Sequence, residues 1–239
     1  MAHSARPVVV LAGHPAPDGA GFEAAADRVM RAAGEPWLGA TLEVADATRP
    51  ADLAARLDTL AGRRVVVVPV LMNAGGTYDL VRRAVGARLG VRLCRPIGAA
   101  PAIARIAEAM AVAACGKHSR EPGRTGLVLA AHGAADDPRA QATTTGHARR
   151  IAASGRFAYV VPAFLEAAPG FRDVLASAKG PAVVVALFLG HGRHVARDVA
   201  AVVARFAPRV IYAGPVGDDP AFARLVLDRA RRALTRPPP

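Results

Sequence analysis

The sequence predicts an α/β protein built from two similar doubly wound parallel-sheet domains, one following the other along the chain. Two observations predict this fold: the chain repeats itself, and each copy alternates apolar runs with helical stretches. The length of 239 residues is sufficient for two domains of ordinary size, each with its own core. An apolar fraction of 52% and a charged fraction of 21% are typical of a globular protein.

The internal repeat has three anchors that occur in the same order in both halves. They are residues 8–17 with 127–136, 65–80 with 183–198, and 95–105 with 214–224. In each pair the two segments are 117 to 119 residues apart. We therefore predict an N-terminal domain over residues 1–118 and a C-terminal domain over residues 124–239, joined through the polar, glycine-containing stretch 115–126.

Each half shows the alternation of a βαβ protein, and the second half shows it most clearly. Its apolar runs are residues 125–132, 157–165, 181–190 and 209–214. Helical stretches are expected near residues 138–153, 170–178, 194–206 and 220–234. Continuous Val/Leu runs indicate strands that are buried on both faces, and strands that alternate with helices form parallel sheets. About four parallel strands are expected in each domain, with ligands bound beyond their carboxyl ends.

Three candidate ligands in the second half follow three different strands. His132 ends the first run, Glu166 ends the second, and His194 lies just past the third, where a helix begins. Two imidazoles and a carboxylate at one sheet edge suit a divalent transition metal. The N-terminus of a helix disfavours positive charge, so it should lower the pKa of His194 and keep this ring neutral.

The first half serves as an internal comparison for these ligands. His132 corresponds to His14, whereas Glu166 falls near Ala47 and His194 falls at Thr77. A role required by the fold would have been kept in both copies. The pattern therefore favours one functional site, carried by the second half.

Composition limits the classes of partner. The net charge of +12 attracts anionic molecules, but aromatic residues are only 5% and no basic block is interleaved with them, which argues against a nucleic-acid surface. Two cysteines are too few for a disulfide scaffold and favour a reducing cytoplasm. We expect no membrane span and no signal peptide. Gly75-Gly76 lacks the residues of a P-loop, so no nucleotide is expected.

Three segments of the second half carry the candidate ligands: LAAHGAADDPRA (129–140), VPAFLEAAPGF (161–171) and LFLGHGRHVARDV (187–199). They resemble segments of the sirohydrochlorin cobalt/iron chelatases, a family of class II, ATP-independent chelatases that act on tetrapyrroles. LAGHPAPDG, VPVLMNAGG and GAAPAIARI match the same segments in the first half, so the resemblance covers nearly the whole chain and is to the two-domain form. The chain departs from the family pattern at Ala134 and Ala135, where Ser-Arg is usual, and at Arg193, which replaces a glycine.

The resemblance implies insertion of Co²⁺, Fe²⁺ or Ni²⁺ into sirohydrochlorin or a related tetrapyrrole, in cobalamin or siroheme biosynthesis, without a nucleotide. It implies that His132, Glu166 and His194 are catalytic and bind the metal. His191 is a fourth candidate ligand. General-base removal of the pyrrole protons by neutral imidazoles fits this chemistry.

Such tetrapyrroles carry many carboxylates. Arg139, Arg193 and Arg197, together with His14, are therefore the candidate substrate-binding residues. Three alternatives stay open: a carrier of metal or tetrapyrrole that does not turn over, a zinc hydrolase, and a nucleic-acid binder. A zinc hydrolase is disfavoured because the sequence lacks a His-Glu-x-x-His helix. We expect the chain to be a monomer or a homodimer.

Overall fold

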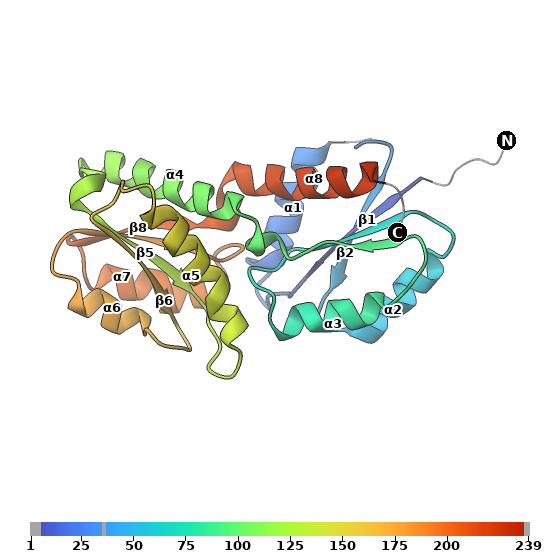
Figure 1. Ribbon diagram of the computed structural model, residues 1–239, viewed down its shortest axis with the longest axis horizontal. Helices are drawn as coiled ribbons and strands as arrows, with labels where there is room; N and C mark the ends of the chain where they lie inside the picture. The colour runs from blue at the N-terminus through green and yellow to red at the C-terminus, as the bar shows by residue number, and fades with distance from the viewer. Residues whose placement is uncertain (1–5, 35–36, 237–239) are drawn as a thin grey trace. The chain divides into compact units, whose positions relative to one another are not determined.

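The computed structural model describes residues 6–34 and 37–236, and every side chain within them except that of His194. It contains two four-stranded sheets whose paired strands are all parallel, with helices flanking each sheet (Figure 1). The predicted fold class is therefore confirmed. The chain forms two compact units, Met1–Ala99 with Ala223–Pro239, and Ala100–Phe222.

Unit 1 contains the first sheet, in the strand order β2-β1-β3-β4. Its elements are β1 (Val8–Gly13), α1 (Phe22–Ala33), β2 (Thr41–Asp46), α2 (Pro50–Thr59), β3 (Val65–Pro69), α3 (Gly76–Val85), β4 (Val91–Leu93) and the 3₁₀ turn η1 (Ile97–Ala99). Strands β1 and β3 are buried at every position because helices cover both faces of a doubly wound sheet. This explains why both strands read as unbroken apolar runs.

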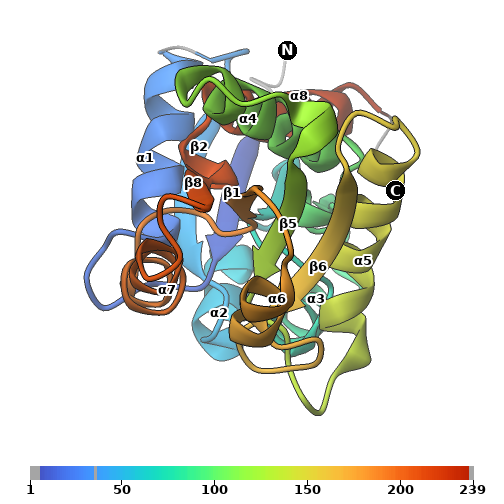
Figure 2. The same cartoon turned by 90° about the vertical axis from the view of Figure 1, so that its left-hand side faces the viewer.

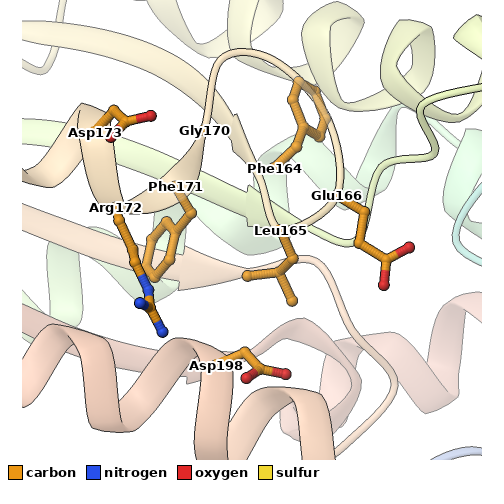
Figure 3. Close-up of a pocket in the computed structure, with 8 residues that line it drawn as sticks. All are labelled: Phe164, Leu165, Glu166, Gly170, Phe171, Arg172, Asp173 and Asp198. Carbon is orange, nitrogen blue, oxygen red and sulfur yellow. The ribbon is translucent and has the colours of Figure 1, made fainter.

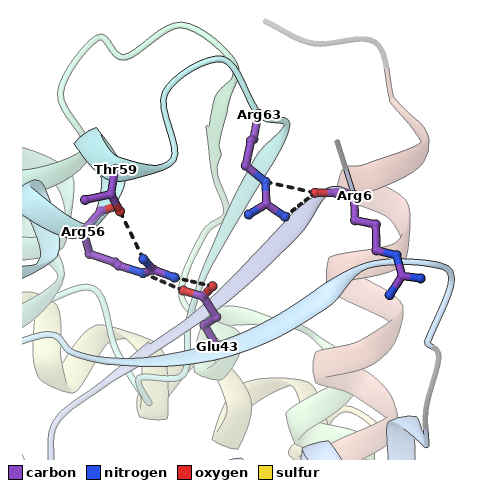
Figure 4. A network of polar contacts seen from close by, with 5 residues as sticks. All are labelled: Arg6, Glu43, Arg56, Thr59 and Arg63. Atoms are coloured by element: carbon purple, nitrogen blue, oxygen red, sulfur yellow. Dashed lines mark hydrogen bonds and ion pairs between the residues drawn. The ribbon is translucent and has the colours of Figure 1, made fainter. Parts of the chain in front are cut away.

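The edge strand of unit 1 is held by a bidentate ion pair (Figure 4). Arg56 of α2 donates from Nε and Nη2 to the two carboxylate oxygens of Glu43 on β2, at 2.8 and 2.5 Å. The carboxylate raises the pKa of Arg56, mainly through the hydrogen bonds and then through its charge. The pair connects α2 to β2 where the strand has no further neighbour in the sheet.

Unit 2 contains the second sheet, in the equivalent order β6-β5-β7-β8. Its elements are α4 (Ala102–Lys117), the 3₁₀ turn η2 (Pro122–Arg124), β5 (Gly126–Ala131), α5 (Pro138–Ala152), β6 (Tyr159–Phe164), α6 (Phe171–Ser177), β7 (Ala182–Ala186), a π-helical turn η3 (His194–Ala200), α7 (Ala201–Ala204), β8 (Val210–Pro215) and the 3₁₀ turn η4 (Val216–Asp218). Within this unit α4 and α5 lie on one face of the sheet and α6 and α7 on the other (Figures 1 and 2).

The compact units differ from the sequence repeats in the place of each repeat's last helix. Helix α4 follows the first sheet in the chain but packs in unit 2, against β7 and β8. Helix α8 (Pro220–Thr235) follows the second sheet, and most of it belongs to unit 1, where Arg229 donates to the carbonyl oxygen of Arg95 at 2.9 Å. The predicted linker also starts three residues too early, because α4 continues to Lys117.

Throughout residues 6–34 and 37–236, no helix combines the length and apolar character that a membrane span requires.

Candidate functional site

The carboxyl edge of the unit 2 sheet brings two of the predicted ligands together. His132 directly follows β5, and Glu166 lies two residues beyond β6, the strand next to β5. Backbone pairing continues past both strands, since the amide of Leu165 donates to the carbonyl of Ala131 at 3.0 Å and that of Glu166 to the carbonyl of His132 at 2.9 Å. The parallel register therefore fixes Glu166 beside His132.

The His132 ring has a defined polarity. Its Nδ1 lies 3.0 Å from the carbonyl oxygen of Gly133 and 3.5 Å from Oε2 of Glu166. A carbonyl oxygen can only accept, so Nδ1 carries the proton and donates it. In the neutral ring the lone pair is then on Nε2, the atom that can bind a metal or take up a proton. The two side chains are 38% and 58% exposed, so both are accessible.

Gly133 makes the turn after His132 possible. Its φ is +74°, in the left-handed region that favours glycine, and a Cβ there would lie 2.9 Å from Cβ of Phe164. Any other residue would strain the backbone and push against β6. The His-Gly sequence therefore follows from the need to end β5 sharply between His132 and the loop to α5.

His194 begins η3, so its backbone lies past β7 as predicted, but its side chain lies outside the described residues. The π-helical form of this turn was not foreseen. π-helical segments are rare and frequent at functional sites. Among the side chains that the structure describes, no group of three His, Cys, Asp or Glu residues is placed to hold a metal ion. The three-ligand site of His132, Glu166 and His194 therefore stays a prediction.

A second imidazole–carboxylate pair lies at the same sheet edge. Nε2 of His191, in the loop after β7, is 2.7 Å from Oδ2 of Asp218 at the end of η4. Sequence reasoning named His191 and missed Asp218. A signal was present, because Asp218 follows the fourth strand and its counterpart in the first half is Ala99.

A pocket of about 440 Å³ opens beside Glu166 (Figure 3). Its lining residues come from the end of β6, the start of α6 and η3; they are Phe164, Leu165, Glu166, Gly170, Phe171, Arg172, Asp173 and Asp198. The two phenylalanines are buried. The lining contains three carboxylates and one guanidinium, a balance that attracts cations more than anions.

Comparison with known proteins gives a family match for the half of the chain that carries these groups. Residues 126–233 match the CbiX family model. The second half of the chain is therefore similar to the CbiX family, and it is called the CbiX half below. The resemblance inferred from the sequence motifs is thereby confirmed for the CbiX half. No curated protein gives a significant match to the chain.

Solved structures support the same fold over the whole chain. A CbiX described as the terminal enzyme for siroheme biosynthesis in denitrifying bacteria is 23% identical, with a TM-score of 0.75 over 96% of this chain and 100% of that one. SirB from Bacillus subtilis with Fe³⁺ is 17% identical, with a TM-score of 0.73 over 96% of both chains. At these identities the likeness shows the fold.

A larger relative comes from Deinococcus radiodurans and is described as a multi-domain protein with structural similarity to chelatases and two additional novel domains. It is 26% identical, with a TM-score of 0.75, and the match covers 98% of this chain. The present chain spans 57% of that protein.

The predicted substrate-binding residues lie at separate places. Arg139, near the start of α5 in the CbiX half, donates from Nε and Nη2 to Asp137 at 2.9 and 2.8 Å, and these bonds hold the pKa of Asp137 below its usual value. Arg193 is exposed directly before η3, and Arg197 is exposed in its last turn. His14 is exposed after β1 and belongs to unit 1.

Proposed function

We propose that this chain inserts a divalent metal, Co²⁺ or Fe²⁺, into sirohydrochlorin or a closely related tetrapyrrole without a nucleotide, in cobalamin or siroheme biosynthesis. One observation carries the proposal. In the CbiX half, His132 is held by the Gly133 carbonyl so that the lone pair of the neutral ring is on Nε2, and Glu166 lies 3.5 Å from Nδ1.

The chemistry of insertion needs these two groups. As the metal enters the macrocycle, two pyrrole N–H groups lose protons that are very weakly acidic in water. Nε2 of His132 can accept a proton at the sheet edge, and a positioned general base is worth about 10²- to 10⁴-fold in rate. The carboxylate of Glu166 then stabilises the imidazolium that forms.

The metal is a substrate here, and the ligand types accept several ions. Imidazole and carboxylate bind Co²⁺, Fe²⁺ and Ni²⁺ alike, so the choice depends on geometry and availability. SirB structures from Bacillus subtilis are described with Fe³⁺ and with cobalt, which supports a metal of this group. His194, with its backbone at the start of η3, would supply a further ligand and His191 another.

Arginines around the same edge suit the acidic arms of the macrocycle. Arg193 and Arg197 would bind substrate carboxylates directly. Arg139 would exchange Asp137 for a substrate carboxylate, because its guanidinium is already engaged. Cys94 and Cys115 are both free and buried thiols, which suits a reducing cytoplasm.

The test is an anaerobic absorbance time course with sirohydrochlorin and, separately, Co²⁺, Fe²⁺ and Ni²⁺. We expect multiple turnovers above the spontaneous rate. His132→Ala should lower kcat by about 10²- to 10⁴-fold, and Glu166→Gln should lower it less, because the ring keeps its bond to Gly133. His194→Ala should abolish insertion.

Thr77→Ala is the matched control, since Thr77 is the first-half counterpart of His194 and should tolerate the change. Normal turnover in His132→Ala would refute the assignment of the base. Tight binding of the tetrapyrrole with no acceleration by the wild-type chain would instead establish the carrier.

A further inference from the structure

The His191–Asp218 pair has the geometry of a held metal ligand. The 2.7 Å separation of Nε2 and Oδ2 is a short, charge-assisted hydrogen bond. A carboxylate accepts, so the neutral ring donates from Nε2 and keeps its lone pair on Nδ1. Metal-binding histidines usually donate their other N–H to such a partner, which fixes tautomer and orientation. The two side chains are 59% and 33% exposed, so an ion in solution can reach them.

A backbone clamp holds Asp218 in this position. The amide of Gly217, the residue before it, donates to the carbonyl oxygen of Phe188 at 3.0 Å. A Cβ at Gly217 would lie 2.1 Å from the carbonyl oxygen of Leu189, so only glycine allows this approach. The clamp ties η4 to the loop that carries His191, and both partners of the pair are therefore fixed relative to each other.

The first half keeps the clamp and lacks the pair. Gly98 donates to the carbonyl oxygen of Leu71 at 2.9 Å, and a Cβ there would lie 2.1 Å from the carbonyl oxygen of Met72. The counterparts of His191 and Asp218 are Ala74 and Ala99. The clamp is thus present in both copies of the fold. In unit 1 the clamp forms without the imidazole and without the carboxylate. The pair is an addition to the fold.

The sheet order places this pair one strand away from the first. His132 and Glu166 follow β5 and β6, while His191 and Asp218 follow β7 and β8, in the order β6-β5-β7-β8. Each carboxylate–imidazole pair spans two adjacent strands. Each ring has one nitrogen committed to an acceptor, so His132 has its lone pair on Nε2 and His191 on Nδ1.

We propose that Nδ1 of His191, in the loop after β7, is a second binding position for the metal substrate, and that Asp218 is the positioning residue that holds the ring. Strand β7 is next to β5, the strand that His132 follows. This inference rests on the proposed function for its choice of ion. Exposure and a fixed ring suit the capture of a hydrated cation before it meets the macrocycle.

The experiment is a titration of the full chain with Co²⁺ alone, followed by the visible absorption of the bound ion. His191→Ala removes the ligand and should weaken Co²⁺ binding by at least about 10-fold; Asp218→Ala should weaken it by about 10- to 100-fold, the usual effect of losing a ligand's carboxylate partner. Asp218→Asn should lose less, because the amide oxygen still accepts from Nε2. His118→Ala and Asp52→Asn are matched controls at exposed positions outside the pair and should bind as the wild type does.

Long-range ¹⁵N–¹H NMR of the histidine rings supplies a readout that a merely structural role would not change. The metal-free wild type should show His191 protonated at Nε2, and Asp218→Ala should show a mixture of tautomers. Wild-type affinity in both His191→Ala and Asp218→Ala, or a chain that binds no Co²⁺, would overturn the inference. Should Asp218→Ala fail to fold, the graded loss in Asp218→Asn decides.

The same data separate this inference from the proposed function. A chain that binds Co²⁺ through His191 but never metallates sirohydrochlorin would retain the inference and lose the chelatase. A chain that turns over normally with His191→Ala and Asp218→Ala, and binds Co²⁺ unchanged, would do the reverse.

Discussion

The clamp at Gly217 allows one substitution to separate the fold from the metal site. In Gly217→Ala the new Cβ starts 2.1 Å from the carbonyl oxygen of Leu189 and 2.4 Å from its carbon, both backbone atoms. Ordinary contact begins at 3.4 Å, so the two segments must separate by about 1.3 Å. Asp218 is the next residue, and a displacement of this size takes its 2.7 Å contact with His191 beyond hydrogen-bond range.

Gly217→Ala should have two consequences, one for stability and one for Co²⁺ affinity. Forcing a methyl group into closely packed backbone should lower the free energy of unfolding by about 1–3 kcal/mol, as overpacking does. Loss of the carboxylate partner should weaken Co²⁺ binding by about 10- to 100-fold. The first is measured by urea unfolding and the second by Co²⁺ titration under conditions where the variant is folded.

Gly98→Ala is the matched control, because the same clash occurs in unit 1 at the same 2.1 Å, from the carbonyl oxygen of Met72. It should show the same loss of stability and wild-type Co²⁺ affinity, since Ala99 holds no imidazole. Equal losses of affinity in Gly98→Ala and Gly217→Ala would refute the reasoning, for the effect would then come from destabilisation alone. If neither substitution changed the free energy of unfolding, the clamp itself would be refuted.

Three further perturbations have outcomes set by the structure. Leu175→Ala in α6 removes a side chain with 0% exposure and should lower the free energy of unfolding by about 2–5 kcal/mol in urea titrations. Tyr159→Phe removes a buried hydroxyl for which the described structure offers no hydrogen-bond partner, so the same titration should show unchanged stability or a gain of up to about 1 kcal/mol. Burial, and then the charge of Asp218, raises the pKa of Tyr212 above its ordinary value of 10.0, so the unfolded chain ionises first; stability should fall as pH rises above 10, and Tyr212→Phe should remove that part of the fall.

The sequence was sufficient for the fold because the repeat and the apolar runs are signals of the main chain. The four apolar runs of the second half became β5 to β8 within a few residues of the predicted bounds. His132 and Glu166 were predicted at one edge because each follows a strand of a parallel sheet, and Nδ1 of His132 lies 3.5 Å from Oε2 of Glu166 there. A parallel register leaves little freedom at the carboxyl end of a strand, so such predictions are comparatively safe.

What the sequence could not supply depends on contacts between distant segments. Helices α4 and α8 are each the last helix of a sequence repeat, and nothing in the local sequence of such a helix shows which sheet it will cover. Asp218 reads as a turn residue beside Asp219 and Pro220. Its partner His191 is 27 residues earlier, and only the clamp between η4 and the loop after β7 brings the two together. The π-helical turn likewise has no characteristic composition from which the sequence could predict it.

Metal insertion into an acidic macrocycle makes two opposed electrostatic demands, and the CbiX half places residues of opposite charge near one sheet edge. A cation is attracted by carboxylates, and Glu166, Asp198 and Asp218 lie in the pocket or the second pair. A polycarboxylate needs cations, and Arg193, directly before η3, and Arg197, within it, are exposed. The chain as a whole carries a net charge of +12. A sheet edge with only such excess positive charge would repel the metal. Under the proposed function, acids paired with imidazoles within a basic protein would allow both substrates to approach this edge.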